Sequence, residues 1–60
     1  MKAWNERRLN WFFRLNFDDK TCKSNIENEI LTVTDEIGDK ITFILKENKI
    51  YSPDTEKYYS

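Results

Sequence analysis

Two stretches in the second half of the chain alternate apolar and polar side chains with the period of two that is typical of β-strands. They are residues 29–35, with the sequence EILTVTD, and residues 40–45, with the sequence KITFIL. Both are rich in β-branched residues, which favour strands. Gly38, the only glycine of the chain, lies between them, and a loop of residues 36–38 places it where glycine adopts a positive φ at little cost. The pattern predicts an antiparallel β-hairpin.

The loop length decides which side chains face each other across this hairpin. A loop of residues 36–38 pairs apolar with apolar residues and threonine with threonine. A loop of residues 37–39 shifts the register by two residues, keeps the same faces and pairs Glu36 with Lys40. The pairs predicted by the first register are Val33 with Ile41, Leu31 with Phe43, Thr32 with Thr42 and Ile30 with Ile44.

Two further turns extend the predicted sheet toward the end of the sequence. The first is residues 46–49, in which Asn48 is the residue best able to adopt a left-handed conformation. The second is a four-residue loop, residues 53–56, which begins with the only proline and suits a type I turn. That loop sets Tyr51 opposite Tyr58, and it predicts a short last strand at the edge of the sheet.

The first half of the chain permits two interpretations. Apolar and polar residues alternate over residues 10–17, as in a half-buried strand. Over residues 3–15 a helix also gathers the large apolar side chains on one broad side. We expect a helical or irregular start followed by a strand from about residue 10. Residues 24–27 have the spacing of a capping box, which predicts one helical turn before the strand at residues 29–35.

The sequence predicts one domain over residues 1–60. Its fold is mainly β, or α+β if the N-terminal segment is helical: a small antiparallel meander sheet or a small barrel of four to five strands. Phe12, Ile30, Ile44 and Ile50 are predicted on the outer face, so both faces carry apolar residues. Such a sheet needs a cover: the N-terminal segment, closure into a barrel, or a partner. The predicted inner face consists of Trp11, Phe13, Leu15, Phe17, Leu31, Val33, Ile41 and Phe43.

The composition argues against most catalytic chemistry. The chain has no histidine, and therefore no imidazole base, Ser-His-Asp arrangement or histidine metal site. Cys22 is the only cysteine, which excludes an internal disulfide and a structural zinc site. We therefore expect a protein that is not an enzyme and needs no metal or cofactor. The lone cysteine, with no signal-peptide pattern and no apolar run long enough to span a membrane, predicts a cytoplasmic location, in the host cytoplasm if the protein is viral.

Charge is distributed unevenly along the chain. Residues 1–14 carry Lys2, Arg7, Arg8 and Arg14 against Glu6, a net charge of +3. The whole chain has a net charge of −1, so residues 15–60 carry −4. Residues 25–39 contain five carboxylates and no basic residue. This acidic stretch is either a solvated turn region or a surface that faces a basic partner.

The most unusual stretch is residues 4–14, with the sequence WNERRLNWFFR. Arginine and tryptophan are enriched at the hot spots of protein interfaces. Arginines interleaved with aromatic residues are also used to hold single-stranded nucleic acid. In the alternative interpretation the aromatic residues belong to the core and the arginines only solvate their surroundings. The predicted partner-binding residues are Trp4, Arg7, Arg8, Phe12 and Arg14.

These features lead to one main hypothesis of function. The protein is a small non-catalytic protein-binding module, an inhibitor or adaptor that occupies a surface of a larger protein. A composition rich in Lys, Asn, Ile, Glu and Tyr suggests an AT-rich genome, as in a phage or plasmid protein that inhibits a host factor. The alternative is a nucleic-acid-binding module that uses the arginine-aromatic segment, although the pI of about 5.3 disfavours it. We expect no membrane partner, and homo-oligomers remain an open alternative.

Overall fold

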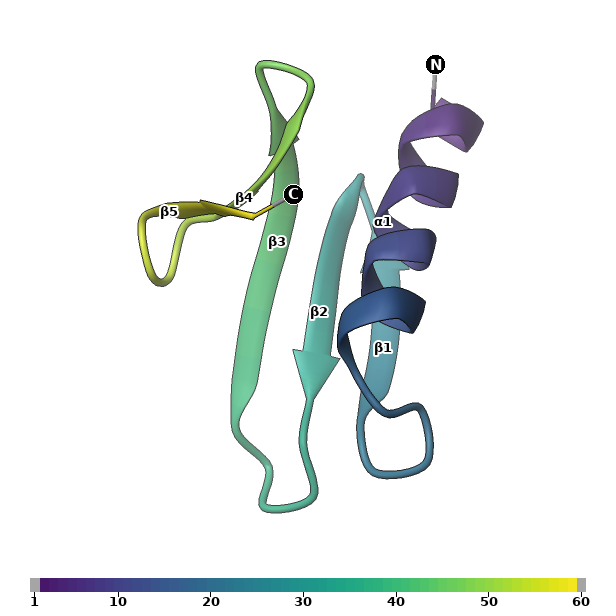
Figure 1. Ribbon diagram of the computed structural model, residues 1–60, viewed down its shortest axis with the longest axis vertical. Helices are drawn as coiled ribbons and strands as arrows, with labels where there is room; N and C mark the ends of the chain where they lie inside the picture. Colours follow the sequence, from purple (N-terminus) through teal and green to yellow (C-terminus); the bar gives the residue numbers. More distant parts are fainter. Residues whose placement is uncertain (1, 60) are drawn as a thin grey trace.

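One helix lies along one face of an open five-stranded sheet, over its first three strands (Figure 1). The structure is a computed structural model that describes residues 2–59. The strands follow each other in the sheet in chain order, each antiparallel to the next. The mainly β meander is therefore confirmed, and closure into a barrel is wrong. The elements are α1 (Lys2–Asn16), β1 (Lys23–Glu27), β2 (Ile30–Thr34), β3 (Lys40–Lys46), β4 (Lys49–Ser52) and β5 (Lys57–Tyr59).

The hairpin of β2 and β3 has the register that the loop of residues 36–38 predicts. The backbone N–H of Asp35 donates to the carbonyl of Asp39 over 3.0 Å, and Gly38 has a φ of 94°. The Asp35 carboxylate accepts hydrogen bonds from the backbone N–H groups of Ile37 and Asp39, at 3.0 and 2.9 Å. The loop is thus held by its own first residue. The pairs are Leu31 with Phe43, Thr32 with Thr42, Val33 with Ile41 and Thr34 with Lys40.

The two later turns also agree with the sequence predictions. Asn48 has a φ of 66°, and Glu47 before it has a φ of 53°, so both residues adopt the left-handed conformation that a two-residue hairpin turn requires. Tyr51 pairs with Tyr58. The backbone N–H of Glu56 donates to the carbonyl of Ser52 over 2.8 Å and closes the loop of residues 53–56. The strand that follows, β5, lies at the edge of the sheet as expected.

Residues 24–27 form part of β1, so the predicted helical turn is wrong. Ile26 pairs with Leu31 and packs against the core, which a strand allows and an isolated helical turn would not. Asn28 and Glu29, with φ values of 53° and 62°, make the turn between β1 and β2. Glutamate seldom adopts this conformation, and no glycine marks the turn. The sequence pattern therefore gave no hairpin signal here.

The helix α1 continues through residue 16, so the predicted strand from about residue 10 is wrong. Leu9, Phe12 and Phe13 have the i, i+3, i+4 spacing of one helical face, and all three are buried against the sheet. The helix ends where Asn16 turns its side-chain amide back to the carbonyl of Phe12, at 2.9 Å. Residues 10–17 also alternate with a period of two, so this stretch is compatible with a helix and with a strand. Burial of the residues at positions 9, 12 and 13 selected the helix.

The core lies between α1 and strands β1–β3, all three of which α1 contacts. Two residues predicted on the inner face, Trp11 and Leu15, are instead exposed on the far side of the helix. Two residues predicted on the outer face, Phe12 and Ile50, are instead buried in the core. The buried apolar residues are Leu9, Phe12, Phe13, Leu31, Val33, Phe43 and Ile50, with Phe17, Ile41 and others packed against them.

Candidate interaction surface

The outer side of α1 exposes large apolar side chains in one stripe. Trp4, Trp11 and Leu15 are 58%, 55% and 76% exposed. They are seven and four residues apart, so they lie along the same side of the helix. The opposite side holds the buried residues Leu9 and Phe13 and fastens the helix to the sheet. We call Trp4, Trp11 and Leu15 the tryptophan stripe.

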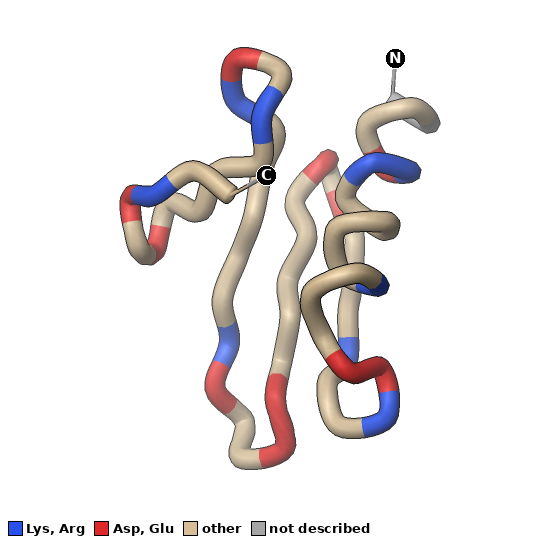
Figure 2. The backbone as a smooth tube through the Cα atoms, in the orientation of Figure 1, with Lys and Arg blue, Asp and Glu red and all other residues tan. Residues whose placement is uncertain are grey.

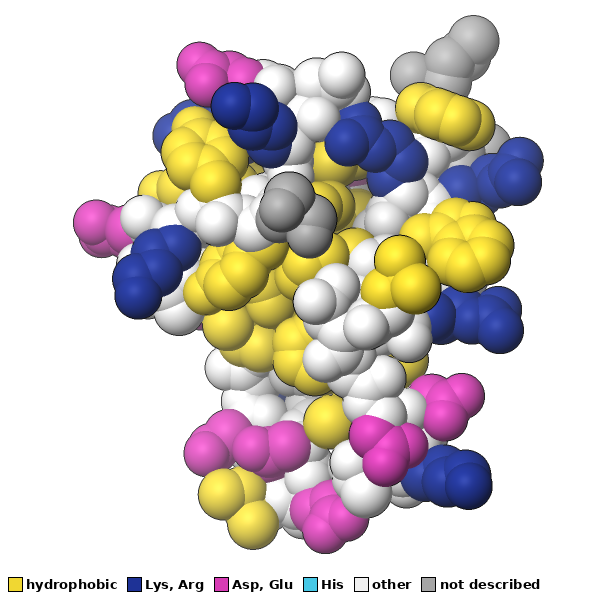
Figure 3. Space-filling model, in the orientation of Figure 1, with side chains coloured by type: hydrophobic (Ala, Val, Ile, Leu, Met, Phe, Trp, Pro, Cys, Tyr) yellow, Lys and Arg dark blue, Asp and Glu magenta, His cyan; other side chains and the backbone are white. Residues whose placement is uncertain are grey.

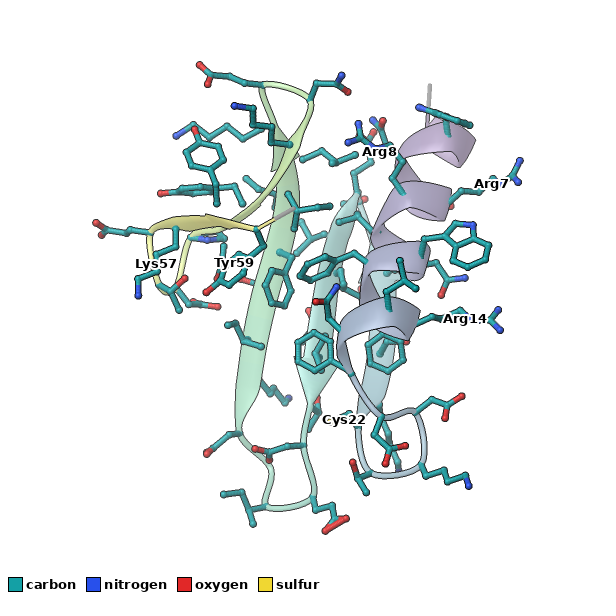
Figure 4. The ribbon with its side chains drawn as sticks, viewed as in Figure 1. Arg7, Arg8, Arg14, Cys22, Lys57 and Tyr59 are labelled. Carbon is teal, nitrogen blue, oxygen red and sulfur yellow. The ribbon has the colours of Figure 1, made fainter. Side chains whose placement is uncertain are left out.

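Arginines border the tryptophan stripe. Arg7 and Arg14 are exposed and point away from the sheet in Figure 4. The guanidinium carbon of Arg14 lies 5.6 Å from the centre of the Trp11 ring, within the range of a cation–π contact. Glu6 is the only carboxylate of α1, and at 100° per residue it lies about 160° around the helix from Trp4. This side of α1 is therefore both apolar and positively charged.

Arg8 is hydrogen-bonded to another part of the chain at the surface. Its guanidinium donates to the side-chain oxygen of Asn48 and, over 2.9 Å, to the Asn48 carbonyl. Figure 4 shows Arg8 directed toward the turn between β3 and β4, unlike the other two arginines. These bonds join the helix to a turn 40 residues away in the sequence. Arg8 is thus a residue that positions the two elements.

Beside Arg8 the surface is hollowed between α1 and the β4–β5 hairpin. One hollow of about 460 Å³ lies on the strand side of Arg8, and another of about 250 Å³ lies on the helix side. Arg8 and Ile50 line both, so the hollows adjoin each other, and we call the two together the groove. Figure 3 shows hydrophobic side chains gathered in this part of the face. The first is lined by Arg8, Asn48, Lys49, Ile50, Tyr58 and Tyr59. The second is lined by Arg8, Trp11, Phe12, Leu15, Asn16 and Ile50.

The five predicted contact residues thus lie in three different parts of the structure. Trp4, Arg7 and Arg14 lie on the outer side of α1. Arg8 lies in the groove and is bound to the β3–β4 turn. Phe12 is 7% exposed: it belongs to the core, and only its edge lines the helix side of the groove. A partner can reach the first three directly, but it can touch only a small part of Phe12.

Sequence reasoning missed the contribution of the last two strands to this surface. The rings of Tyr51 and Tyr58 are 4.8 Å apart. The ammonium groups of Lys46 and Lys49 lie 4.5 and 6.0 Å from the centres of the Tyr51 and Tyr58 rings, respectively. The pairing of Tyr51 with Tyr58 was readable from the loop length. The place of Lys49 and Tyr58 beside Arg8 in the larger hollow was not readable, because Arg8 is at least 40 residues away from them in the sequence.

The opposite end of the molecule is acidic. Figure 2 shows Asp and Glu concentrated in the two loops at the end of the long axis away from the β3–β4 turn. These loops hold Asp18 and Asp19 after α1 and three carboxylates within residues 35–39. Ile37, at the tip of the second loop, is 82% exposed. The carboxylates of these two loops are therefore separated from the groove.

The residues that the structure describes contain no cluster of metal-binding side chains. Nowhere in residues 2–59 do three histidine, cysteine or carboxylate side chains gather closely enough to hold a metal ion. Cys22 is half-buried and packs at the edge of the core. Hydrogen bonds from Thr42, through its backbone N–H at 2.7 Å and its hydroxyl at 2.8 Å, lower the pKa of the exposed Asp54 carboxyl. Asp54 thus caps a free edge of β3 as a carboxylate.

Comparison with known proteins gives no relative from which a function could be transferred. No protein-family model matches the chain, and no significant match is found among curated proteins or among solved structures. In the part of the chain that the structure describes, no helix has the length and apolar character needed to span a membrane.

Proposed function

We propose that the protein is a non-catalytic protein-binding module that acts as an inhibitor or adaptor by occupying a surface of a larger protein through the outer side of α1. The tryptophan stripe supports this proposal most directly. Tryptophan buries roughly 150–250 Å² when it is covered, yet Trp4 and Trp11 are both more than half exposed beside a 76% exposed leucine. These three side chains contribute favourable free energy only when their apolar surface is removed from water, as it would be under a partner.

The arginines indicate the chemistry of the partner surface. Arg7 and Arg14 offer planar forks of N–H donors that suit carboxylates, and they lie beside an apolar stripe with no carboxylate between them. A partner with an acidic, partly apolar surface would match both features. The helix is fastened by Leu9, Phe12 and Phe13, so the contact residues are already ordered before binding.

The origin and location of the protein belong to the same proposal. The composition favours an AT-rich phage or plasmid genome, so the larger protein would be a host factor in the cytoplasm. Nucleic acid is the second candidate partner, because two lysines approach the paired tyrosines of β4 and β5. The acidic end of the molecule and the net charge of −1 disfavour it.

The test is an affinity measurement with the protein that the immobilised chain retains from a lysate, identified by mass spectrometry and then purified. Trp11→Ala and Arg14→Ala should each weaken binding by about 30-fold, as hot-spot truncations of about 2 kcal/mol do. Ile37→Ala removes an even more exposed apolar side chain at the acidic end and is the control, with folding checked by thermal melting.

Equal affinity of the Trp11, Arg14 and Ile37 variants would contradict the proposed surface. Binding to single-stranded oligonucleotides that weakens steeply with salt, together with loss of that binding on Lys46→Ala, would favour the nucleic-acid alternative. A protein complex loses far less affinity over the same salt range unless its contacts are purely ionic.

A further inference from the structure

The groove between α1 and the β4–β5 hairpin combines an apolar floor with a positively charged rim. Ile50 is buried at its centre, Tyr58 and Tyr59 form one wall, and Arg8 and Lys49 are its two charged residues. None of the residues that line either hollow is a carboxylate. A volume of about 460 Å³ for the larger hollow falls within the range of ligand pockets, roughly 300–1,000 Å³. The groove is thus large enough to take a bulky side chain.

We infer that this groove seats an acidic segment of the partner protein, with one large apolar side chain against Ile50 and Tyr59 and carboxylates on Arg8 and Lys49. The inference rests on the proposed function and specifies what the partner presents. The groove adjoins the tryptophan stripe, since Trp11 and Leu15 line its helix side. One segment can therefore contact both surfaces.

Both cations are arranged to receive carboxylates. A guanidinium has five N–H donors, and the bonds of Arg8 to Asn48 use one on each terminal nitrogen. Three donors remain on a side chain whose position is already fixed, which lowers the entropic cost of binding. Lys49 pairs directly with Lys46 across the hairpin, and such like charges repel each other. A bound carboxylate relieves this repulsion.

The position of the groove favours a short acidic segment over a nucleic-acid strand. The molecule is 31 Å long, and its acidic loops lie at the end away from the β3–β4 turn. An extended chain of phosphates that followed the groove along α1 would approach Asp18 and Asp19, which repel it. A segment with two or three carboxylates beside one apolar side chain stays within reach of Arg8 and Lys49.

The experiment is panning of a random peptide library on the intact protein, followed by binding of the enriched synthetic peptides. We expect peptides with several Asp or Glu residues around one Leu, Phe or Trp. In the Trp4→Phe variant, Trp11 is the only tryptophan, so its fluorescence reports occupancy of the groove. Lys49→Glu should weaken binding about tenfold or more, because it reverses a charge that faces the ligand.

Lys57→Glu is the matched control. It makes the same charge change on the same hairpin, outside the residues that line the groove (Figure 4), and should weaken binding less than about threefold. Thermal melting of both variants shows that they are folded, and Lys49→Gln provides a milder second variant. Absence of enriched peptides, enriched peptides without acidic residues, or equal effects of the two glutamate variants would overturn the inference.

Two competing occupants are separated by further measurements. The first is nucleic acid, tested with a twelve-nucleotide oligothymidine. If it binds more tightly than the peptides, if its binding depends strongly on salt and if Lys49→Glu abolishes that binding, the groove is assigned to nucleic acid and the inference is overturned. Self-association of the wild-type chain, lost in Lys49→Glu, would assign it to a second copy with the same consequence. The proposed function is tested separately with the purified partner protein. If Arg14→Ala weakens binding of that partner while Lys49→Glu does not, the proposed function stands and the groove inference fails.

Discussion

The two sides of α1 are built from similar residues but have opposite roles. The inner side places Leu9, Phe12 and Phe13 against the sheet, with Leu9 completely buried. The outer side places a leucine and two tryptophans in solvent. Hydrophobicity alone would assign both sets to a core. The angular position around the helix decides which set stabilises the fold and which set is available to a partner.

The comparison shows how the chain keeps an apolar surface available without losing its structure. The inner side fixes the helix by close aromatic packing, with the Phe12 and Phe43 ring centres 4.8 Å apart. The outer side is bordered by the exposed charges of Arg7 and Arg14. Under the proposed function, stability and recognition are separated on one element, and substitutions on the two sides should have separable effects.

The largest expected effect comes from a matched pair of leucine substitutions. Leu9→Ala should lower the free energy of unfolding by about 2–5 kcal/mol, because it removes a completely buried side chain. That is a large share of the roughly 3–9 kcal/mol that a domain of this size has. Leu15→Ala, the same change on the outer side, should cost less than about 0.5 kcal/mol. Urea unfolding followed by circular dichroism measures both, and equal losses would refute the separation of the two sides.

Arg8 lies at the boundary between the two sides, and its removal should have an intermediate effect. Arg8→Ala deletes two hydrogen bonds to Asn48 and should lower stability by about 1 kcal/mol. The loss should be local, because these bonds join α1 to the β3–β4 turn. Hydrogen exchange should accelerate in β4 and β5 more than in β2. Uniform acceleration across the sheet would show that Arg8 does not hold the hairpin specifically.

The strands were predictable where short-range signals agreed with each other. In the hairpin of β2 and β3, the period-two pattern, the position of Gly38 and the cross-strand pairing of threonines all supported one register, and the structure has it. In β1 these signals were absent, because Asn28 and Glu29 form the turn without glycine. The polar sequence around Ile26 carried no alternation strong enough to outweigh the capping-box spacing.

The candidate surface was predictable only in part. The arginine-aromatic segment was identified from the sequence. Which of its residues are buried depends on its helical conformation and on the side of the helix that faces the sheet. Trp11 and Phe12 exchanged their expected places for that reason. The groove unites Arg8 with Lys49 and Tyr58, both of which are more than 40 residues away from Arg8 in the sequence. No local pattern reports such a contact.

Trp11→Ala tests the outer side of α1 and should leave the fold almost unchanged. Trp11 is 55% exposed, and its contact with Arg14 is a surface cation–π interaction of about 0.5–1 kcal/mol. We therefore expect a shift in the free energy of unfolding of no more than about 1 kcal/mol, alongside the loss of partner affinity proposed above. Unfolding of this variant under conditions in which the wild type is folded would show that Trp11 is needed for the stability of the fold.

The smallest effect is expected for a substitution remote from both sides of α1. Hydrogen bonds from the Thr42 backbone N–H and hydroxyl lower the pKa of Asp54 in the folded protein. The folded state therefore favours the charged form, so the stabilisation is complete above the pKa of about 3.9 of an unfolded aspartate. It is lost as the pH falls through the lower pKa of the folded state.

Asp54→Asn should consequently be slightly less stable than the wild type at pH 7. The difference should begin to shrink as the pH falls below about 3.9 and should vanish once the pH is below the lower pKa of the folded state. Glu36→Gln makes the same charge change in an exposed loop and serves as the control. Urea midpoints measured between pH 2.5 and 7 provide the comparison. A difference that grows on acidification would reverse the assigned sign and contradict the role of Asp54 as the carboxylate that caps β3. Partner affinity at pH 7 should be the same for both variants, because neither residue lies on α1 or in the groove.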